Sequence, residues 1–257
     1  MAAVTNDDYV TLRKFRLFGI LWILGLSGVL SLLLVPLPLP ELLPAPPAFY
    51  RPLMLLQPLV LLTVMTWVGT TLASKVGFDV PLIRAIYEGG KVGEVVRSQL
   101  IPAATVTLVV FMTLLGIQGL AEPHLPTAYL EINKSAETLL PPVTRFLYGG
   151  ITEEILMRWG LMTLLVWLPW KFLQKSNGRV KAGIVWGAIA ITALLFGIGH
   201  LPLLFELVPQ ASTFLVTYII GLNALVGIAA GWLYWKRGLE AAIMAHMLFH
   251  LLGLVAQ

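Results

Sequence analysis

Long apolar runs separated by short polar stretches set the pattern of the whole chain. A helix needs about 20 consecutive, mostly apolar residues to cross a bilayer. Runs of about that length cover residues 17–35, 53–73, 100–120, 142–170, 182–200, 211–235 and 239–255. The pattern predicts an all-α, polytopic bundle of about seven transmembrane helices. An eighth span would require splitting a long run or counting the amphipathic stretch within residues 74–99.

Composition agrees with this interpretation. Hydrophobic residues make up 58% of the chain and charged residues only 12%, whereas soluble domains have about 25% charged residues. The net charge of +4 does not indicate nucleic-acid binding, because the basic residues lie in short clusters between apolar runs. The chain has no cysteine, which excludes disulfides, thiolate metal ligands and a cysteine nucleophile.

The basic clusters predict an orientation in the membrane. Lysine and arginine are concentrated at the start of the chain, in residues 74–99, after residue 170 and at Lys236 and Arg237. Cytoplasmic loops carry the positive excess, so we expect the amino terminus in the cytoplasm and an odd number of spans. The first run exceeds the apolar core of a signal peptide, which is about 7–15 residues, and a retained helix is expected there. Residues 36–52 are proline-rich and predict a stiff, non-helical connection.

Few ionisable side chains lie at membrane depth. They are Glu153, Glu154, Arg158, His200, His246 and His250. Such groups are costly inside a bilayer and usually face a polar site in the bundle interior. In an α-helix, Glu154 and Arg158 are one turn apart and can pair. Glu153 then points about 100° away and is free to face another helix.

These residue types suit hydrolysis. A carboxylate and an imidazole that share one water molecule can remove its proton. His246 and His250 lie on one helix face and could donate to the oxyanion that forms when water attacks a carbonyl. Ser27 and Ser31 are far from these motifs in the sequence, so water is the expected nucleophile. His124, in the acidic loop at residues 121–142, is expected to be an ordinary surface residue.

Three motifs in late spans occur in a recognisable order. They are Glu-Glu-x-x-x-Arg at 153–158, Phe-x-x-x-His at 196–200 and His-x-x-x-His at 246–250. The ordered set resembles the CAAX-protease and bacteriocin-processing family (CPBP, or Abi) of intramembrane endopeptidases. The resemblance covers residues 143–257 as a catalytic core, whereas residues 1–142 carry no matching motif.

The resemblance implies a glutamate-dependent intramembrane endopeptidase without a cofactor. Glu153 and His200 would activate the water, His246 and position 250 would stabilise the oxyanion, and Glu154 and Arg158 would support the site. The family commonly has asparagine or aspartate where this chain has His250, although a neutral histidine can also donate a hydrogen bond. The implied substrate is a membrane-associated protein or peptide. Eukaryotic members cleave prenylated proteins, but nothing in the sequence indicates whether this substrate is lipidated.

Two alternatives use the same residues differently. His246 and His250 could chelate zinc together with His200 and a glutamate, although Met247 stands where a His-Glu-x-x-His motif has its glutamate. A proton relay in a transporter, or an inactive scaffold or immunity protein, is the non-enzymatic alternative.

Helix geometry raises one difficulty for a shared site. At the α-helical rise, Glu153 lies about 25 Å from Lys171, whereas His246 lies only about 12 Å from Arg237. The helices must therefore tilt or break for the motifs to meet, and Gly149-Gly150 and Gly197/Gly199 are the expected places. The pairs Gly183/Gly187 and Gly227/Gly231 predict close helix packing.

Overall fold

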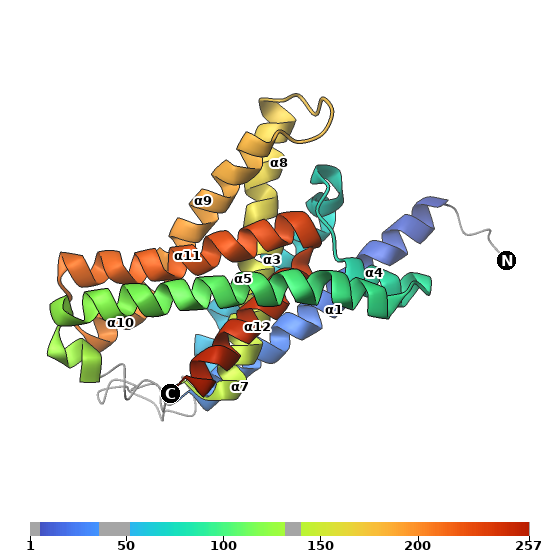
Figure 1. The fold of residues 1–257 in the computed structure, drawn as a ribbon. Coiled ribbons are helices and arrows are strands. Elements are labelled where there is room, and N and C mark those ends of the chain that lie inside the picture. Colours follow the sequence, from blue (N-terminus) through green and yellow to red (C-terminus); the bar gives the residue numbers. More distant parts are fainter. Residues whose placement is uncertain (1–5, 36–51, 132–139, 257) are drawn as a thin grey trace.

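The computed structural model describes residues 6–35, 52–131 and 140–256. Within these ranges every regular element is helical and no strand is present (Figure 1). The prediction of an all-α bundle is confirmed. The proline-rich connection predicted at 36–52 and part of the acidic loop fall largely outside the described residues.

All seven expected spans are helical. Among the described residues, five helices are long and apolar enough to cross a membrane: Arg13–Leu34, Pro52–Val76, Val92–His124, Ala182–Leu207 and Thr213–Arg237. Their main helices are α1 (Asn6–Ser31), α3 (Leu56–Leu72), α5 (Val92–Ala121), α9 (Ala182–Gly199) and α11 (Thr213–Arg237). The last expected span along the chain is α12 (Leu239–Val255), with 17 residues. The remaining one, fourth along the chain, is the helix at 142–172, which carries the glutamates and is here named the motif helix.

Residues 74–99 contain one short helix and the first turns of a long one. The short amphipathic helix expected within residues 74–99 is α4 (Pro81–Glu88), which ends at Gly89 with a left-handed φ of 68°. The third span was expected to begin near residue 100, but α5 begins at Val92. Arg97 and Gln99 are therefore helical residues that extend the span beyond its apolar part.

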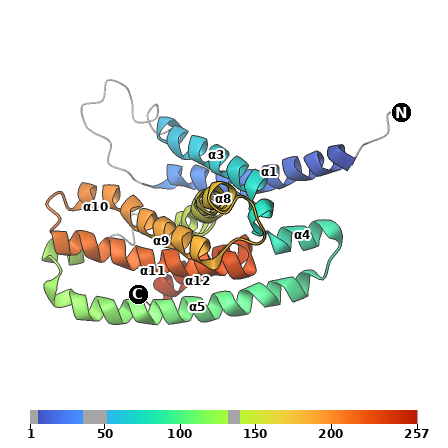
Figure 2. The ribbon, with the colours of Figure 1, turned by 90° about the horizontal axis from the view of Figure 1, so that it is seen from above.

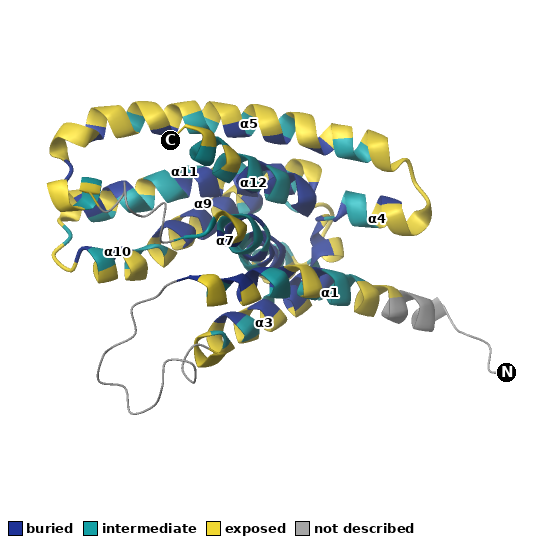
Figure 3. Ribbon diagram, turned by 90° about the horizontal axis from the view of Figure 1, so that it is seen from below, coloured by how far each residue is buried: buried dark blue, intermediate teal, exposed yellow. Residues whose placement is uncertain are grey.

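The motif helix occupies the centre of the bundle. Viewed along its axis, it has α1 and α3 on one side and α9, α11 and α12 on the other, with α5 outermost (Figure 2). The buried residues gather around this central helix, whereas the outer face of α5 is largely exposed (Figure 3). The most polar span of the chain is thus the one most enclosed by its neighbours, as the cost of ionised groups in lipid requires.

Most of the motif helix has π-helical rather than α-helical hydrogen bonding. It consists of α7 (Pro142–Thr144), the π-helices η4 (Arg145–Glu153) and η5 (Ile155–Met162), and α8 (Thr163–Phe172). The hydrogen bonds of threonine hydroxyls to backbone carbonyls differ between the two kinds of helix. Thr192 Oγ1 in α9 donates to the carbonyl four residues earlier, whereas Thr152 and Thr163 donate to carbonyls five residues earlier, those of Leu147 and Arg158.

The α-helical geometry expected around the glutamates is therefore wrong in this respect. A π-helix has a wider turn than an α-helix, so the angle between adjacent side chains is smaller than the α-helical value. Segments of π-helix are rare and frequently mark functional sites. Glu154 lies between the two π-helices.

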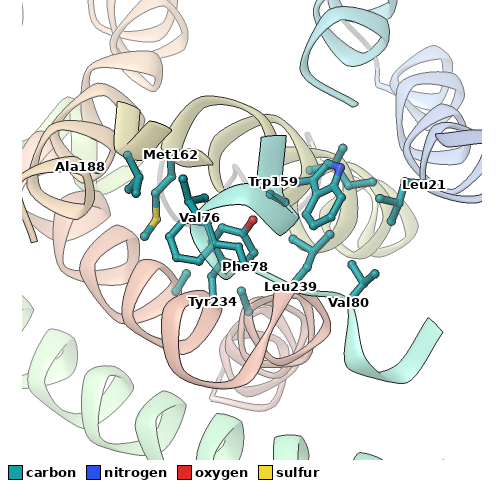
Figure 4. Packing of buried hydrophobic residues seen from close by; sticks show 14 of the residues in the cluster. Leu21, Val76, Phe78, Val80, Trp159, Met162, Ala188, Tyr234 and Leu239 are labelled. Carbon is teal, nitrogen blue, oxygen red and sulfur yellow. The ribbon is translucent and has the colours of Figure 1, made fainter. Parts of the chain in front are cut away.

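The main apolar core joins both halves of the chain. Trp159 and Met162 of the motif helix pack with Phe78, Tyr234 and Leu239, which come from three other segments (Figure 4). The Phe78 and Tyr234 rings are 4.6 Å apart between centroids. Trp159 and Met162 come after the glutamates in the sequence. The core therefore holds the second half of the motif helix in place without filling the polar site.

The amino-terminal helices pack closely against the motif helix. Thr152 Oγ1 donates to the Gly25 carbonyl of α1 at 2.8 Å. A Cβ atom at Gly28 would overlap Thr152 Oγ1, and one at Gly69 of α3 would overlap the Trp159 side chain. Glycine allows these backbones to approach closely, as is common between helices in lipid. The helices without a recognised motif thus form one wall of the central helix.

One of the two expected small-residue pairs has the expected role. A Cβ at Gly227 would lie 2.8 Å from Ala193 Cα, and one at Gly231 would lie 3.2 Å from Ile189, so α11 and α9 are in close contact. The prediction for Gly183 and Gly187 is wrong, because an added Cβ there meets no atom within 4 Å.

Candidate functional site

The centre of the polar cluster is Glu154, which is fully buried. Its Oε2 lies 3.2 Å from Arg158 Nε, so the pair expected from the sequence is present. Its Oε1 lies 2.8 Å from Nδ1 of His246 on α12. Arg158 is also fully buried and donates to the Gly227 carbonyl of α11 at 3.1 Å. One carboxylate therefore connects the motif helix to α12, while its arginine connects the same helix to α11.

His200 follows the last residue of α9, where the chain turns into α10 (Leu201–Leu207). Its Nδ1 lies 2.8 Å from the Phe196 carbonyl oxygen. A carbonyl can only accept, so Nδ1 carries the proton that is donated. In the neutral ring Nε2 is then unprotonated and can act as a base. The Phe-x-x-x-His spacing produces this bond, because it places the carbonyl one turn before the imidazole.

The Phe196 ring lies among the charged and aromatic groups of the cluster. The guanidinium of Arg158 lies 5.1 Å from its centroid, which is within the range of a cation–π interaction. The His200 and His246 rings meet it edge to face, with centroids 4.8 and 5.9 Å away. Phe196 thus contacts both the buried arginine and His200.

His250 lies one turn after His246, and the two rings are stacked with centroids 4.8 Å apart and planes 21° from parallel. His250 Nε2 is buried and has no hydrogen-bond partner among the described residues. A Cβ at Gly149 would lie only 2.6 Å from this atom. A buried ring nitrogen without a partner is unusual in a folded protein, and this one lies against η4, one helical turn before Glu153.

Glu153 is half-buried, and its neighbour Glu154 is completely buried. Its carboxylate is close enough to His246 and His200 for both imidazoles to act on it electrostatically. Tyr148 is also half-buried and lies within electrostatic range of Glu153. The structure therefore gathers all six residues expected at membrane depth around the middle of the motif helix.

The motifs meet because the helices cross and because α9 ends at Gly199, one of the two places where a break was expected. The motif helix crosses α5 and α11 steeply (Figure 1), and it is continuous through Gly149-Gly150. These glycines instead allow α12 to approach, since a Cβ at Gly150 would lie 2.5 Å from Met247. Gly197 similarly allows the Ile220 backbone of α11 to approach α9.

Two side chains outside the cluster complete the comparison with the sequence. His124 is exposed, as expected, and its ring lies 6.2 Å from that of Phe214. Asn223 Nδ2 donates to the Ile219 carbonyl in its own helix at 2.9 Å.

The imidazole donors do not converge as zinc ligands do. The His246 and His250 rings stack face to face, and the Nδ1 of His246 is already bonded to Glu154. In the described part of the chain, no three histidine, aspartate or glutamate side chains are grouped so that they could hold a metal ion. The donor set therefore does not fit the tetrahedral arrangement of a zinc site.

Three contributions to the site were not identified from the sequence. They are the steric fit of Gly149 against His250, the Gly227 carbonyl that receives Arg158, and the central position of the Phe196 ring. The phenylalanine was part of a motif, and the glycines stood out as pairs. Only the packing of helices distant in sequence reveals what each contacts.

Fold and site together define an integral membrane protein with an acid–base cluster enclosed in its helical bundle. Residues 135–252 match the family model described as Type II CAAX prenyl endopeptidase Rce1-like. This part of the chain, which contains all six residues of the cluster, is similar to that family, and the match confirms the resemblance drawn from the motifs. No curated protein and no solved structure gives a significant match. The family implies a peptidase, and the apolar spans make it a membrane protein.

Proposed function

We propose that this protein is a glutamate-dependent intramembrane endopeptidase that hydrolyses a peptide bond of a membrane-associated protein or peptide. The observation that supports the proposal best is the convergence of three motifs from three helices: Glu154 bonds to His246, and Phe196 contacts His246 and bonds to His200. Glu153, the half-buried carboxylate beside them, is the proposed catalytic residue.

In the proposed reaction, Glu153 and His200 activate a water molecule. The Nδ1–H of His200 is held by the Phe196 carbonyl at 2.8 Å, which leaves Nε2 as the basic atom. A water that donates to this nitrogen and to the Glu153 carboxylate would lose a proton as it attacks the substrate carbonyl. The proton then passes to the leaving amine, so atoms and charge balance over the cycle.

His246 and His250 are the proposed donors to the oxyanion. His246 Nδ1 donates to Glu154, so its Nε2 carries a proton only when the ring is an imidazolium. The Glu154 carboxylate at 2.8 Å would stabilise that cation. The unpartnered Nε2 of His250 would supply a second donor. Arg158 holds Glu154 in place, and the network thereby aligns the donors before substrate arrives.

Replacement of Glu153 by glutamine tests the proposal. Glutamine keeps the shape of the side chain but cannot accept a proton from water, so cleavage of a reporter peptide by purified protein should fall by at least about 10²-fold. Glu206→Gln is the matched control, because Glu206 is exposed on α10 and should retain full activity. Wild-type cleavage by a folded Glu153→Gln protein would refute the proposal, and proton-coupled uptake without peptidase activity would favour a transporter.

We further propose that the amino terminus is cytoplasmic. Arg13, Lys14 and Arg16 precede the first span, and Lys236 and Arg237 lie between the last two spans. The positive-inside rule predicts that both of these basic clusters lie in the cytoplasm. Labelling of single cysteines in intact cells would test the orientation, and the chain is suited to it because it has no cysteine of its own.

A further inference from the structure

A hollow of about 380 Å³ lies away from the acid–base cluster, where the first turns of α5 meet the end of α11. The two helices run side by side in both views (Figures 1 and 2). The hollow is within the size range of small-molecule sites, about 300–1,000 Å³. Its lining consists of Glu94, Arg97, Ser98, Ile101, Pro102 and Arg237.

Two arginines in this lining have no ionic partner among the described residues. Arg97 and Arg237 are both exposed and neither forms a salt bridge there. The acidic residue of the lining, Glu94, is paired with Lys91 at 2.8 Å. The hollow therefore has a net positive charge that nothing in the described protein neutralises, and guanidinium groups bind phosphate oxygens through paired hydrogen bonds.

The backbone on which Arg237 sits is fixed in place. Gln99 is almost completely buried, and its Nε2 donates to the Arg237 carbonyl at 2.9 Å. The same nitrogen lies 3.3 Å from Glu240 Oε2, and Glu240 Oε1 accepts from the Ile83 backbone of α4 at 3.0 Å. Four helices, α4, α5, α11 and α12, are thereby joined beside the lining residues, and the backbone at the end of α11 is fixed relative to α5.

An apolar track leads away from the arginines along α5. Ile101, Leu108 and Met112 follow Arg97 at helical spacing and are 55%, 53% and 59% exposed. Arg97 precedes the apolar part of α5, and Arg237 ends the apolar span of α11. A hollow that carries two arginines at the ends of apolar spans, continued by an exposed apolar strip, matches the two parts of a phospholipid rather than a free anion.

We propose that this hollow binds an anionic phospholipid, with the phosphate between Arg97 and Arg237 and an acyl chain along Ile101, Leu108 and Met112. Basic pockets between transmembrane helices bind anionic headgroups in this way. The bound lipid would bridge α5 and α11, which are otherwise joined at this end through Gln99.

Native mass spectrometry of the full chain in detergent tests the proposal. Short-chain phosphatidylglycerol is titrated, with phosphatidylcholine of the same chain length in a parallel arm. Wild-type protein should bind phosphatidylglycerol preferentially. The double variant Arg97→Gln/Arg237→Gln should bind it at least about tenfold more weakly, since two charge-assisted contacts are lost. Arg179→Gln, which removes the same charge from the exposed loop between α8 and α9, should bind as wild type does.

Several outcomes would overturn the assignment. They are unchanged binding by the double variant, an equal loss in Arg179→Gln, equal binding of phosphatidylcholine, or displacement of the lipid by inorganic phosphate at a similar concentration. The last result would identify a site for a free anion. Melting temperatures without added lipid verify folding, and if the double variant does not fold, Arg97→Gln alone gives the same test at an exposed position of α5.

Discussion

At the level of single residues, the site depends on one carboxylate that contacts two partners. Glu154 bonds to His246 and pairs with Arg158, and all three side chains are buried. The sequence predicted the pairing within the helix, because a spacing of four residues brings the two groups together. It could not predict the partner on α12, since that contact depends on how two helices distant in sequence cross.

Removal of one member of this network should cost more stability than removal of two. Arg158→Met leaves Glu154 as a buried, uncompensated charge, and the free energy of unfolding should fall by about 3–5 kcal/mol. Glu154→Gln/Arg158→Met removes both charges and should recover part of that loss. Thermal unfolding in detergent measures both variants.

The control for this comparison is Arg179→Met, at an exposed arginine in the loop between α8 and α9. Its stability should change by less than about 0.5 kcal/mol. If Arg158→Met unfolds at the same temperature as this control, the buried ion pair does not contribute to stability as described.

At the level of elements, the main surprise is the π-helical stretch of the motif helix. Apolar periodicity predicted the helix at residues 142–170, and the observed element covers 142–172. Hydrophobicity cannot distinguish hydrogen bonding to the fourth residue from bonding to the fifth. The bonds from Thr152 and Thr163 to carbonyls five residues earlier required coordinates to detect.

Close contact between α9 and α11 gives a prediction at this scale. Gly227→Ala places a methyl group 2.8 Å from the Ala193 backbone and disturbs the carbonyl that receives Arg158. Overpacking of this kind costs about 1–3 kcal/mol, so the melting temperature and the cleavage rate should both fall. Gly187→Ala is the matched control in α9, because its methyl group meets no atom within 4 Å. An equal effect of the two substitutions would contradict the packing described.

At the level of the whole molecule, the positions and order of the seven expected helices were predictable because long apolar runs mark them. The six residues of the cluster were also predictable, because ionisable groups at membrane depth are rare. The central position of the motif helix was not, since it arises from contacts with α1 and α3 as well as with α9, α11 and α12. Dividing the chain at residue 142 separates the helices with motifs from those without. It does not describe the packing, because helices from both parts surround the motif helix.

A fragment experiment follows from that packing. Residues 140–257 expressed alone would expose the surfaces of η4 and η5 that contact α1 and α3, including Trp159, which is 2% exposed in the full chain. We expect this fragment to aggregate in detergent and to cleave no reporter peptide. Co-expression with residues 1–139 should restore a single peak in size-exclusion chromatography and restore cleavage. A monodisperse, active fragment on its own would contradict the expectation.

The glycines of α1 and α3 have a consequence for recognising related chains. Gly28 and Gly69 lie where any larger side chain would overlap Thr152 or Trp159. A chain with the same central helix must therefore keep glycine at these two positions, or have smaller side chains opposite them. Two small residues at fixed distances from the glutamates would then serve as a signature in the half of the molecule where no catalytic motif exists.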